Sequence, residues 1–156
     1  LKKLKISGIQ SISNKIPFPK APIEITLTFD LTNKTKMGFP NKYGITLKNS
    51  KGEYYTVGYD NIDRCFYADR THATGENFSS SFPSLHYAPY IIREPAVTWR
   101  MIIDVSSVEL FAADGKVVVT DLVFPSVIFD EIGLFAENGQ IEVSKVTVRE
   151  LNSIWK

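Results

Sequence analysis

The side chains of this chain best suited to chemistry lie between Asp104 and Glu109, where two carboxylates flank Ser106 and Ser107. Retaining glycosidases use two carboxyl groups about 5–5.5 Å apart, one as nucleophile and one as acid/base. The serine pair can change the face of the strand to which each carboxylate points. A carboxylate pair within a strand pattern more often belongs to a satisfied hydrogen-bonding network. We therefore predict that this chain has no catalytic residues.

Nucleophilic catalysis by serine and metal binding are the two other kinds of chemistry that the residue types allow. Residues 79–81 are serines close to His86, but no Gly-x-Ser-x-Gly sequence surrounds them, so no hydrolase triad is predicted. His72 and His86 are the only histidines, and their spacing is not that of a metal site. We predict no metal and no other cofactor. The one alternative is a surface calcium ion held by three carboxylates: Asp60, Asp63 and Asp69.

Length, composition and charge predict one globular domain. A chain of 156 residues can bury a sizeable core, so we expect a single domain over residues 1–156. A net charge of +1 without a basic stripe excludes nucleic acid as a favoured partner. No apolar run approaches the roughly 20 residues that span a membrane, and the single Cys65 excludes an internal disulfide. Because the chain opens with Leu1 rather than Met, we expect it to be a piece of a longer protein.

The elements that must position these side chains are strands. Apolar and polar residues alternate over residues 23–31, 43–47 and 55–59, and again over 97–105. A period of two places one side of each strand on a core and the other in water. No window has convincing helical periodicity. Many short strands separated by turns predict an all-β fold, a two-sheet antiparallel β-sandwich of the concanavalin or jelly-roll kind.

Turn signals separate the predicted strands. Residues 49–52 are typical of a hairpin loop between two alternating segments. Asp114-Gly115 and Asn138-Gly139 predict two further hairpins, because both dipeptides suit a type I′ turn, whose central residues need positive φ.

Two segments depart from regular alternation. The apolar phase slips by one residue between Val143 and Val146, which predicts a β-bulge at Ser144-Lys145. Residues 61–95 are less regular and too long for a hairpin loop. We expect part of this segment to cross between the sheets and to offer binding residues.

Five motifs occur in a fixed order along most of the chain. The most distinctive is residues 103–111, which contains the two carboxylates. The others are residues 43–47 with 57–60, Asp69-Arg70-Thr71 with Gly75 and Phe78, Thr120 with Phe124-Pro125, and residues 151–155. Together they resemble the C-terminal β-sandwich of glycoside hydrolase family 32, the levanases, inulinases and invertases. The chain departs from that pattern at Val105, where the family usually has Arg, so the role of that Arg is not transferred.

The resemblance implies a parent enzyme that cleaves β-linked fructosides with retention. Its Asp nucleophile, Glu acid/base and transition-state-stabilising Asp lie on a five-bladed β-propeller that precedes the sandwich. This chain has no Asn-Asp-Pro-Asn, Arg-Asp-Pro or Glu-Cys motif. We therefore expect a non-catalytic accessory domain whose partner is its own upstream propeller. An enzyme acting on polymeric fructan would be exported.

The alternative function is fructan binding, because the family 32 sandwich also resembles fructan-binding modules. Carboxylates accept hydrogen bonds from sugar hydroxyls, and arginine donates in a fixed fork. In the competing interpretation, Asp69-Arg70 pins a turn by an ion pair and Glu109 satisfies a buried backbone donor. The candidate sugar-binding residues are Asp69, Arg70, Asp104 and Glu109, with Tyr67 or Tyr87 as an aromatic platform.

Both tryptophans are predicted to have packing roles. Trp99 alternates in phase with Val97 and Met101, which places it in the core. We expect Trp155 to pack against the propeller or to cap the edge of the sandwich. The surface that the propeller covers would be exposed in the isolated chain, which could form a homodimer through it.

Overall fold

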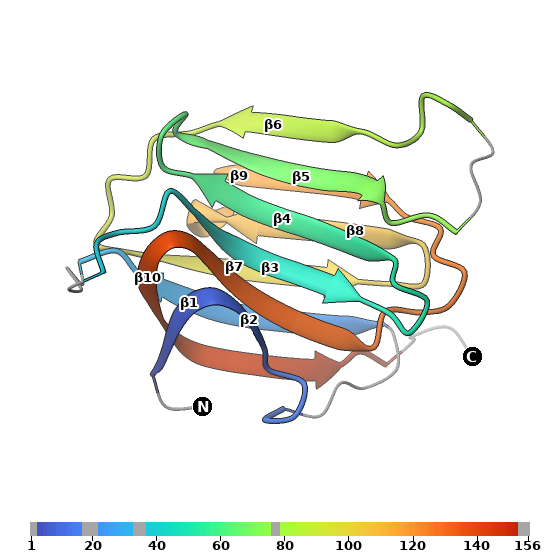
Figure 1. Cartoon of the computed structure of the whole chain (residues 1–156), viewed down its shortest axis with the longest axis horizontal. Coiled ribbons are helices and arrows are strands. Elements are labelled where there is room, and N and C mark those ends of the chain that lie inside the picture. The colour runs from blue at the N-terminus through green and yellow to red at the C-terminus, as the bar shows by residue number, and fades with distance from the viewer. Residues whose placement is uncertain (1–2, 17–21, 33–36, 76–78, 153–156) are drawn as a thin grey trace.

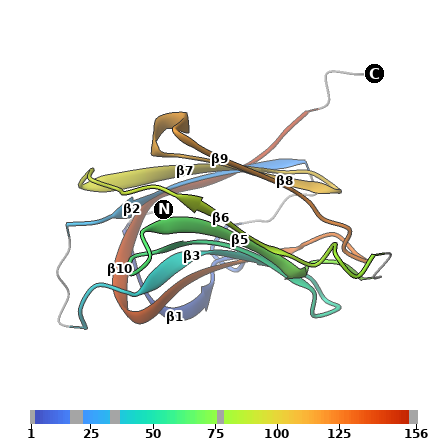
Figure 2. The same ribbon diagram turned by 90° about the horizontal axis from the view of Figure 1, so that it is seen from above.

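The computed structural model describes residues 3–16, 22–32, 37–75 and 79–152, which form one continuous antiparallel sheet folded into two packed layers (Figure 1, Figure 2). Most strands turn their buried apolar side chains toward the opposite layer, as β2 does with Ile23, Ile25 and Leu27, which explains why the sheet folds over on itself. The predicted all-β sandwich is confirmed. The helical structure of these residues is limited to one 3-10 turn, Ala113–Gly115, and none of their helices is long and apolar enough to cross a membrane.

The strand order shows how the two layers are joined. The first sheet has the order β6-β5-β4-β3-β10, and the second has the order β10-β2-β7-β8-β9. The strands are β1 (Leu4–Ser11), β2 (Ile23–Asp30), β3 (Lys42–Lys48), β4 (Tyr54–Asp60), β5 (Cys65–His72), β6 (Leu85–Pro89), β7 (Ala96–Ile103), β8 (Ser107–Ala112), β9 (Val117–Leu122) and β10 (Glu131–Glu150). β10 therefore belongs to both sheets, and β1 runs beside it.

The 20-residue strand β10 bends from one sheet into the other at a side of the sandwich that we call the corner. Its residues 131–137 pair with β3, and its residues 142–150 pair with β2. Asn138, at φ 54°, lies between these two halves. The prediction of a hairpin at Asn138-Gly139 was wrong. The positive φ bends a continuous strand there, because β3 and β2 supply partners on both sides of the bend.

Other turn predictions agree more closely with the structure. The bulge is confirmed, because the register between β10 and β2 shifts after Ser144 and Lys145 adopts φ 53°. Residues 49–52 lie in the loop that joins β3 to β4, as predicted. Asp114-Gly115 does connect β8 to β9, but the loop is longer than a two-residue turn, since Ala112 pairs with Val117.

The irregular segment 61–95 resolves into two strands and a crossing. β5 and β6 continue the first sheet, and residues 90–95 lead from β6 into β7 of the second sheet. The expected crossing between sheets is therefore present. It lies at the left end of the molecule as drawn in Figure 1.

Aromatic rings fill one end of the core. The Trp99 ring is fully buried, with centroid distances of 4.8 Å to Phe29, 5.6 Å to Phe66 and 6.0 Å to Tyr43. Edge and tilted contacts of this kind favour the ring quadrupoles. Trp155 lies outside the described residues.

Candidate functional site

The outer face of the first sheet, opposite the core, has a row of directly paired residues that crosses all its strands. From the β6 edge to the corner, the row consists of Tyr87, Tyr67, Gly58, Gly44, Phe135 and Ile9. The two adjacent glycines in the middle of the row have no side chains of their own, and the Tyr67 and Phe135 rings stand on either side of them. A groove lined by Tyr67, Phe135 and Ile9 lies on this face, and we call it the outer-face groove.

The central glycines are required by their neighbours. A Cβ atom on Gly58 would lie 2.5 Å from Cζ of Tyr67, and one on Gly44 would meet the backbone of Val57. The Tyr67 ring consequently lies across Gly58. Burial, and secondarily the charge of Glu137, raises the pKa of Tyr67, so its hydroxyl remains protonated at neutral pH.

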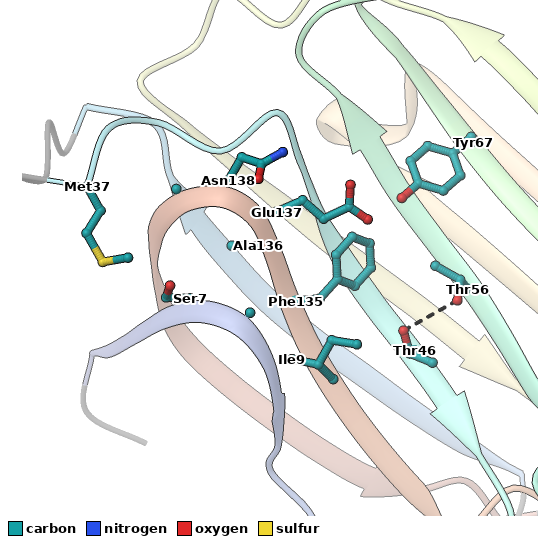
Figure 3. Close-up of a pocket in the computed structure, with 12 residues that line it drawn as sticks. Ser7, Ile9, Met37, Thr46, Thr56, Tyr67, Phe135, Ala136, Glu137 and Asn138 are labelled. Atoms are coloured by element: carbon teal, nitrogen blue, oxygen red, sulfur yellow. Dashed lines mark hydrogen bonds between the residues drawn. The ribbon is translucent and has the colours of Figure 1, made fainter.

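The outer-face groove has a volume of about 670 Å³ and a mixed lining (Figure 3). Phe135 and Ile9 provide apolar surface on the β10 and β1 side. Thr46 and Thr56 face each other with 3.4 Å between their hydroxyl oxygens, and Glu137 adds a carboxylate at the rim. An apolar lining with a few polar groups is typical of ligand-binding and docking surfaces.

A second hollow, of about 270 Å³, extends the groove toward β6. Tyr67 lines both hollows, and Asp69 and Tyr87 line the second. Oδ1 of Asp69 accepts hydrogen bonds from the backbone N–H of Thr71 at 2.9 Å and from its hydroxyl at 2.6 Å. Three of the candidate sugar-binding residues therefore lie together on this face.

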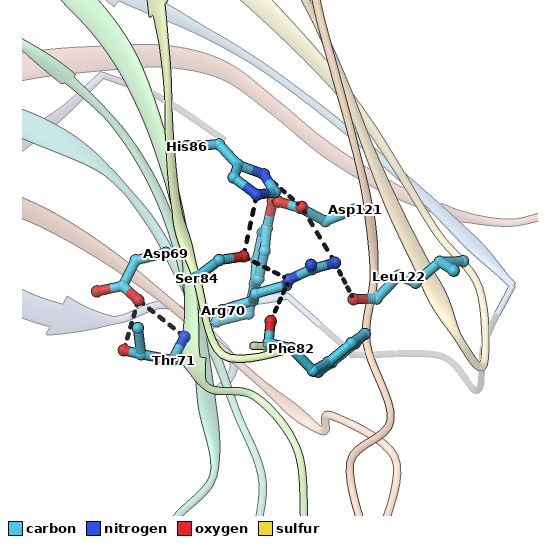
Figure 4. A network of polar contacts seen from close by, with 9 residues as sticks. Asp69, Arg70, Thr71, Phe82, Ser84, His86, Asp121 and Leu122 are labelled. Carbon is cyan, nitrogen blue, oxygen red and sulfur yellow. Dashed lines mark hydrogen bonds and ion pairs between the residues drawn. The ribbon is translucent and has the colours of Figure 1, made fainter. Parts of the chain in front are cut away.

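Arg70 lies on the opposite side of β5, toward the side of the sandwich away from the corner (Figure 4). There β5 approaches β9 of the second sheet across a gap, which we call the seam, with an isolated bridge between Thr74 and Phe124. The Arg70 guanidinium spans the seam. Its Nη1 lies 3.8 Å from Oδ1 of Asp121, and its Nε donates to Ser84 Oγ at 2.8 Å.

Asp121 is the acceptor on which the seam contacts converge. Its side chain is only 1% exposed. Its Oδ2 accepts a hydrogen bond from the Tyr55 hydroxyl at 2.8 Å, and its Oδ1 lies 3.0 Å from Nδ1 of His86. Burial, and secondarily the charge of Asp121, raises the pKa of Tyr55, which keeps this hydroxyl a donor. Because a buried carboxylate needs partners, the network joins the two sheets.

Ser84, His86 and Asp121 stand in the order of a Ser-His-Asp relay, with Ser84 Oγ 2.9 Å from Nε2 of His86. Two features oppose a nucleophilic role. Oδ1 of Asp121 has no aligned hydrogen bond from His86, and Arg70 Nε already donates to Ser84 Oγ. Neither hollow of the outer face includes Ser84 among its lining residues. The arrangement closes the seam and does not present a reactive serine.

The calcium alternative receives no support from the geometry. Oδ1 of Asp60 accepts hydrogen bonds from the backbone N–H groups of Ile62 at 2.8 Å and Asp63 at 3.0 Å. Across residues 3–16, 22–32, 37–75 and 79–152, no cluster of three or more His, Cys, Asp or Glu side chains could hold a metal ion. The Asp60 carboxylate instead stabilises the turn between β4 and β5.

Comparison with known proteins shows to which family this chain belongs. The model of a family described as glycosyl hydrolases family 32 C terminal matches residues 2–150. The chain belongs to this family. In the family 32 C-terminal domain described here, β10 and the seam therefore join two sheets of a known type of sandwich.

Relatives of this family 32 domain include proteins named levanase and exo-inulinase. A levanase of Bacillus sp. (strain L7) is 31% identical over 119 residues, which are 76% of this chain and 13% of that protein. An extracellular exo-inulinase of Aspergillus awamori is 29% identical over 161 residues, covering 93% of this chain and 30% of that protein. The crystal structure of exo-inulinase from that fungus matches 99% of this chain and 29% of its own, with a TM-score of 0.76 and 22% identity. The chain thus spans less than a third of these relatives.

Asp104 and Glu109, within the most distinctive family 32 motif, lie apart from the outer-face groove. Asp104 is in the turn between β7 and β8, where its N–H donates to Ser107 O at 2.9 Å and its Oδ1 accepts from the N–H of Val105 at 2.7 Å. Glu109 stands opposite Ile102 on the second sheet. The expected strand over residues 97–105 ends at Ile103, so the motif is a hairpin and not one strand.

Asp121 and Ser84 of this family 32 domain were not among the residues predicted from the sequence. A signal for Asp121 was present, because it is in phase with Val117 and Val119 and so points inward from β9. A carboxylate in an inward position must find partners, which predicts a buried polar network. Ser84 has no comparable signal, since it precedes the short edge strand β6.

Proposed function

We propose that this family 32 domain is the non-catalytic accessory sandwich of a β-fructosidase, and that the outer face of its first sheet supports the catalytic domain. The chain spans less than a third of the levanase and exo-inulinase relatives named above, which leaves room for a catalytic domain in the parent polypeptide. The catalytic partner we propose is the upstream propeller that the family resemblance implies.

The observation on which the proposal rests is the apolar character of this outer face. Ile9 is 67% exposed, and Met37, Leu85 and Tyr87 are also exposed, all four lining the outer-face groove or its extension. Exposed apolar side chains grouped around a groove mark an interaction surface.

The centre of the second sheet's outer face is different. There Arg100 Nε lies 2.6 Å from Oε2 of Glu24, and the hydroxyls of Thr28 and Thr98 lie 2.9 Å apart. Paired charges and hydroxyls of this kind are suited to contact with water. This contrast at the centres of the two faces supports the first sheet as the docking side.

The test is a pair of variants in the full-length enzyme that contains this domain. Ile9→Asp should lower the unfolding temperature of the catalytic domain, because a charge would be buried in the proposed interface. Val118→Asp is the matched control, since Val118 is 53% exposed on the second sheet. Equal effects of both variants would refute the proposed docking side.

A second candidate function is fructan binding at the outer-face groove, favoured by the convergence of Tyr67, Tyr87 and Asp69 there. Calorimetric titration of levan and inulin into the chain tests it directly. Tyr87→Ala should weaken binding about tenfold, which corresponds to about 1.4 kcal/mol. Glu109→Gln, on the other sheet, serves as the control. Levan binding that Tyr87→Ala weakens and Glu109→Gln does not would support a binding module, whereas no heat on adding levan would refute it.

A further inference from the structure

A separate pocket of about 470 Å³ lies at the end of the sandwich where β3 begins, and we call it the end pocket. Residues from the β4–β5 connection and from the β6–β7 crossing line it, both at the left end of Figure 1. It shares no lining residue with the outer-face groove. Its volume falls within the range of roughly 300–1,000 Å³ that is typical of small-molecule sites.

The Tyr43 hydroxyl is the most informative group in the end pocket. The Tyr43 ring is fully buried against Phe29 and Tyr59, at centroid distances of 4.7 and 5.8 Å. Tyr43 is one of the residues that line the pocket, and its buried hydroxyl has no hydrogen-bond partner among the residues the structure describes. The neighbouring Tyr59 hydroxyl, in contrast, donates to Tyr90 O at 2.9 Å.

An unpartnered buried hydroxyl is costly, and phenylalanine would fill the same space without that cost. Burial, and secondarily the nearby Tyr59, raises the pKa of Tyr43 far above its ordinary value. The hydroxyl therefore stays protonated and can donate as well as accept. A ligand in the end pocket would supply the missing partner.

Charged side chains of both signs also line the end pocket. The guanidinium groups of Arg64 and Arg93 line the pocket, and no described residue forms an ion pair or side-chain hydrogen bond with either. Arg64 is held at φ 53°, an uncommon conformation for a residue with a side chain. Hydrogen bonds from its own backbone N–H and from that of Arg93 lower the pKa of Glu94, so this carboxylate is an ionised acceptor.

We propose that the end pocket binds a small neutral molecule with several adjacent hydroxyl groups, a free sugar or polyol. Such a ligand needs donors and acceptors together, which Arg64, Arg93 and Glu94 provide, and the Tyr43 hydroxyl completes the set. An anion would suit the two arginines but would be repelled by Glu94. An apolar ligand would leave both guanidinium groups and the Tyr43 hydroxyl without partners.

This proposal does not depend on the accessory function, because it concerns a pocket built from this chain alone. The probes are fructose, glycerol and inorganic phosphate, each titrated into the 156-residue chain by calorimetry and by NMR chemical shifts. We expect saturable fructose binding with shifts at residues 61–64 and 91–94, and no competition from phosphate.

Tyr43→Phe is the decisive variant, because it removes only the unpartnered oxygen. It should weaken fructose binding about tenfold while the thermal unfolding midpoint stays equal or rises. Arg93→Gln should also weaken binding, and Tyr67→Phe in the outer-face groove should not. Fructose shifts at the groove residues instead, or unchanged affinity in Tyr43→Phe, would overturn the proposal. So would binding of phosphate alone, or of no probe.

Discussion

The two sides of the sandwich are closed by different means. At the corner, the backbone of β10 continues from one sheet into the other, and β1 pairs with both of its halves. At the seam, β5 and β9 are joined by side chains, with Arg70, His86 and Tyr55 meeting Asp121.

The difference shows where this fold depends on residue identity. Backbone hydrogen bonds at the corner are available to any residue except proline, and sterics alone limit the choice there. The seam depends on a few side chains, and losing one leaves a buried charge without its partner. We therefore expect the seam to be more sensitive to conservative substitutions and the corner to be sensitive mainly to added volume.

The largest effect is expected at the centre of the seam. Asp121→Ala removes the acceptor of the Tyr55 hydroxyl and the carboxylate that balances the charge of Arg70, and should lower the free energy of unfolding by about 3–5 kcal/mol. Urea denaturation measures the change. Asp63→Ala is the control, because Asp63 is exposed and its substitution should cost less than about 0.5 kcal/mol. Equal stability of the two variants would show that the seam does not need its carboxylate.

Added volume should disturb the corner. A Cβ atom on Gly139 would lie 2.6 Å from the backbone N of Pro40 and 2.7 Å from the carbonyl carbon of Phe39. Gly139→Ala should therefore cost about 2 kcal/mol, since the backbone must move. Gly133→Ala on the same strand is the matched control, because its Cβ would have no neighbour closer than 3.7 Å. A similar loss in both variants, read by thermal unfolding, would contradict the steric argument.

The hydroxyls of Tyr55 and Tyr43 differ in whether they have a hydrogen-bond partner among the described residues. Tyr55→Phe removes the 2.8 Å hydrogen bond to Asp121 and should cost about 1.5 kcal/mol, the value for a bond to a charged group. Tyr43→Phe removes a hydroxyl with no partner among the described residues and should cost nothing in the absence of ligand. Chemical denaturation of both variants tests the pair, and an equal loss would mean that Tyr43 has an unseen partner.

The smallest expected effect is a pH dependence at Glu53, which joins the β3–β4 loop to the connection between β9 and β10. Burial acts to raise its pKa, but hydrogen bonds from Ser126 and Asn49 outweigh burial and lower the pKa from 4.5. The folded state thus binds fewer protons than the unfolded state near that pH. The stability contribution is present above about pH 4.5 and is lost as the pH falls through the folded pKa.

Comparison with Glu53→Gln measures this contribution. The variant should be less stable than the parent chain at pH 6 by under about 1 kcal/mol, because the site is close to the surface. The difference should shrink as the pH falls below about 4.5 and through the lower folded pKa of Glu53. A difference that does not change as the pH falls would assign the effect to packing and not to the charge of the carboxylate.

Local patterns were sufficient to predict the strands and the bulge, and distant partners explain what they missed. The phase slip between Val143 and Val146 is a local property of one strand, so it predicted the bulge at Lys145 correctly. Asn138-Gly139 has the positive φ expected of a turn, yet the strand continues because β1, β2 and β3 pair along it.

In the candidate site, too, only relations between residues close in sequence could be predicted. Alternation along β5 places Tyr67 and Asp69 on one side and Arg70 on the other, so their separation follows from the period of two. The partner of Arg70 did not follow from its neighbours, because Asp121 is 51 residues later in the chain and faces it only once the two sheets pack.

The pairing of β1 with β10 also constrains when this domain can fold. Leu4 stands opposite Val143, so the first strand waits for the last, while β3 to β6 can assemble from neighbouring segments. Contacts this distant in sequence slow folding because the long loop must close first. During synthesis, β1 and β2 leave the ribosome long before β10, and their apolar faces must be shielded until it arrives.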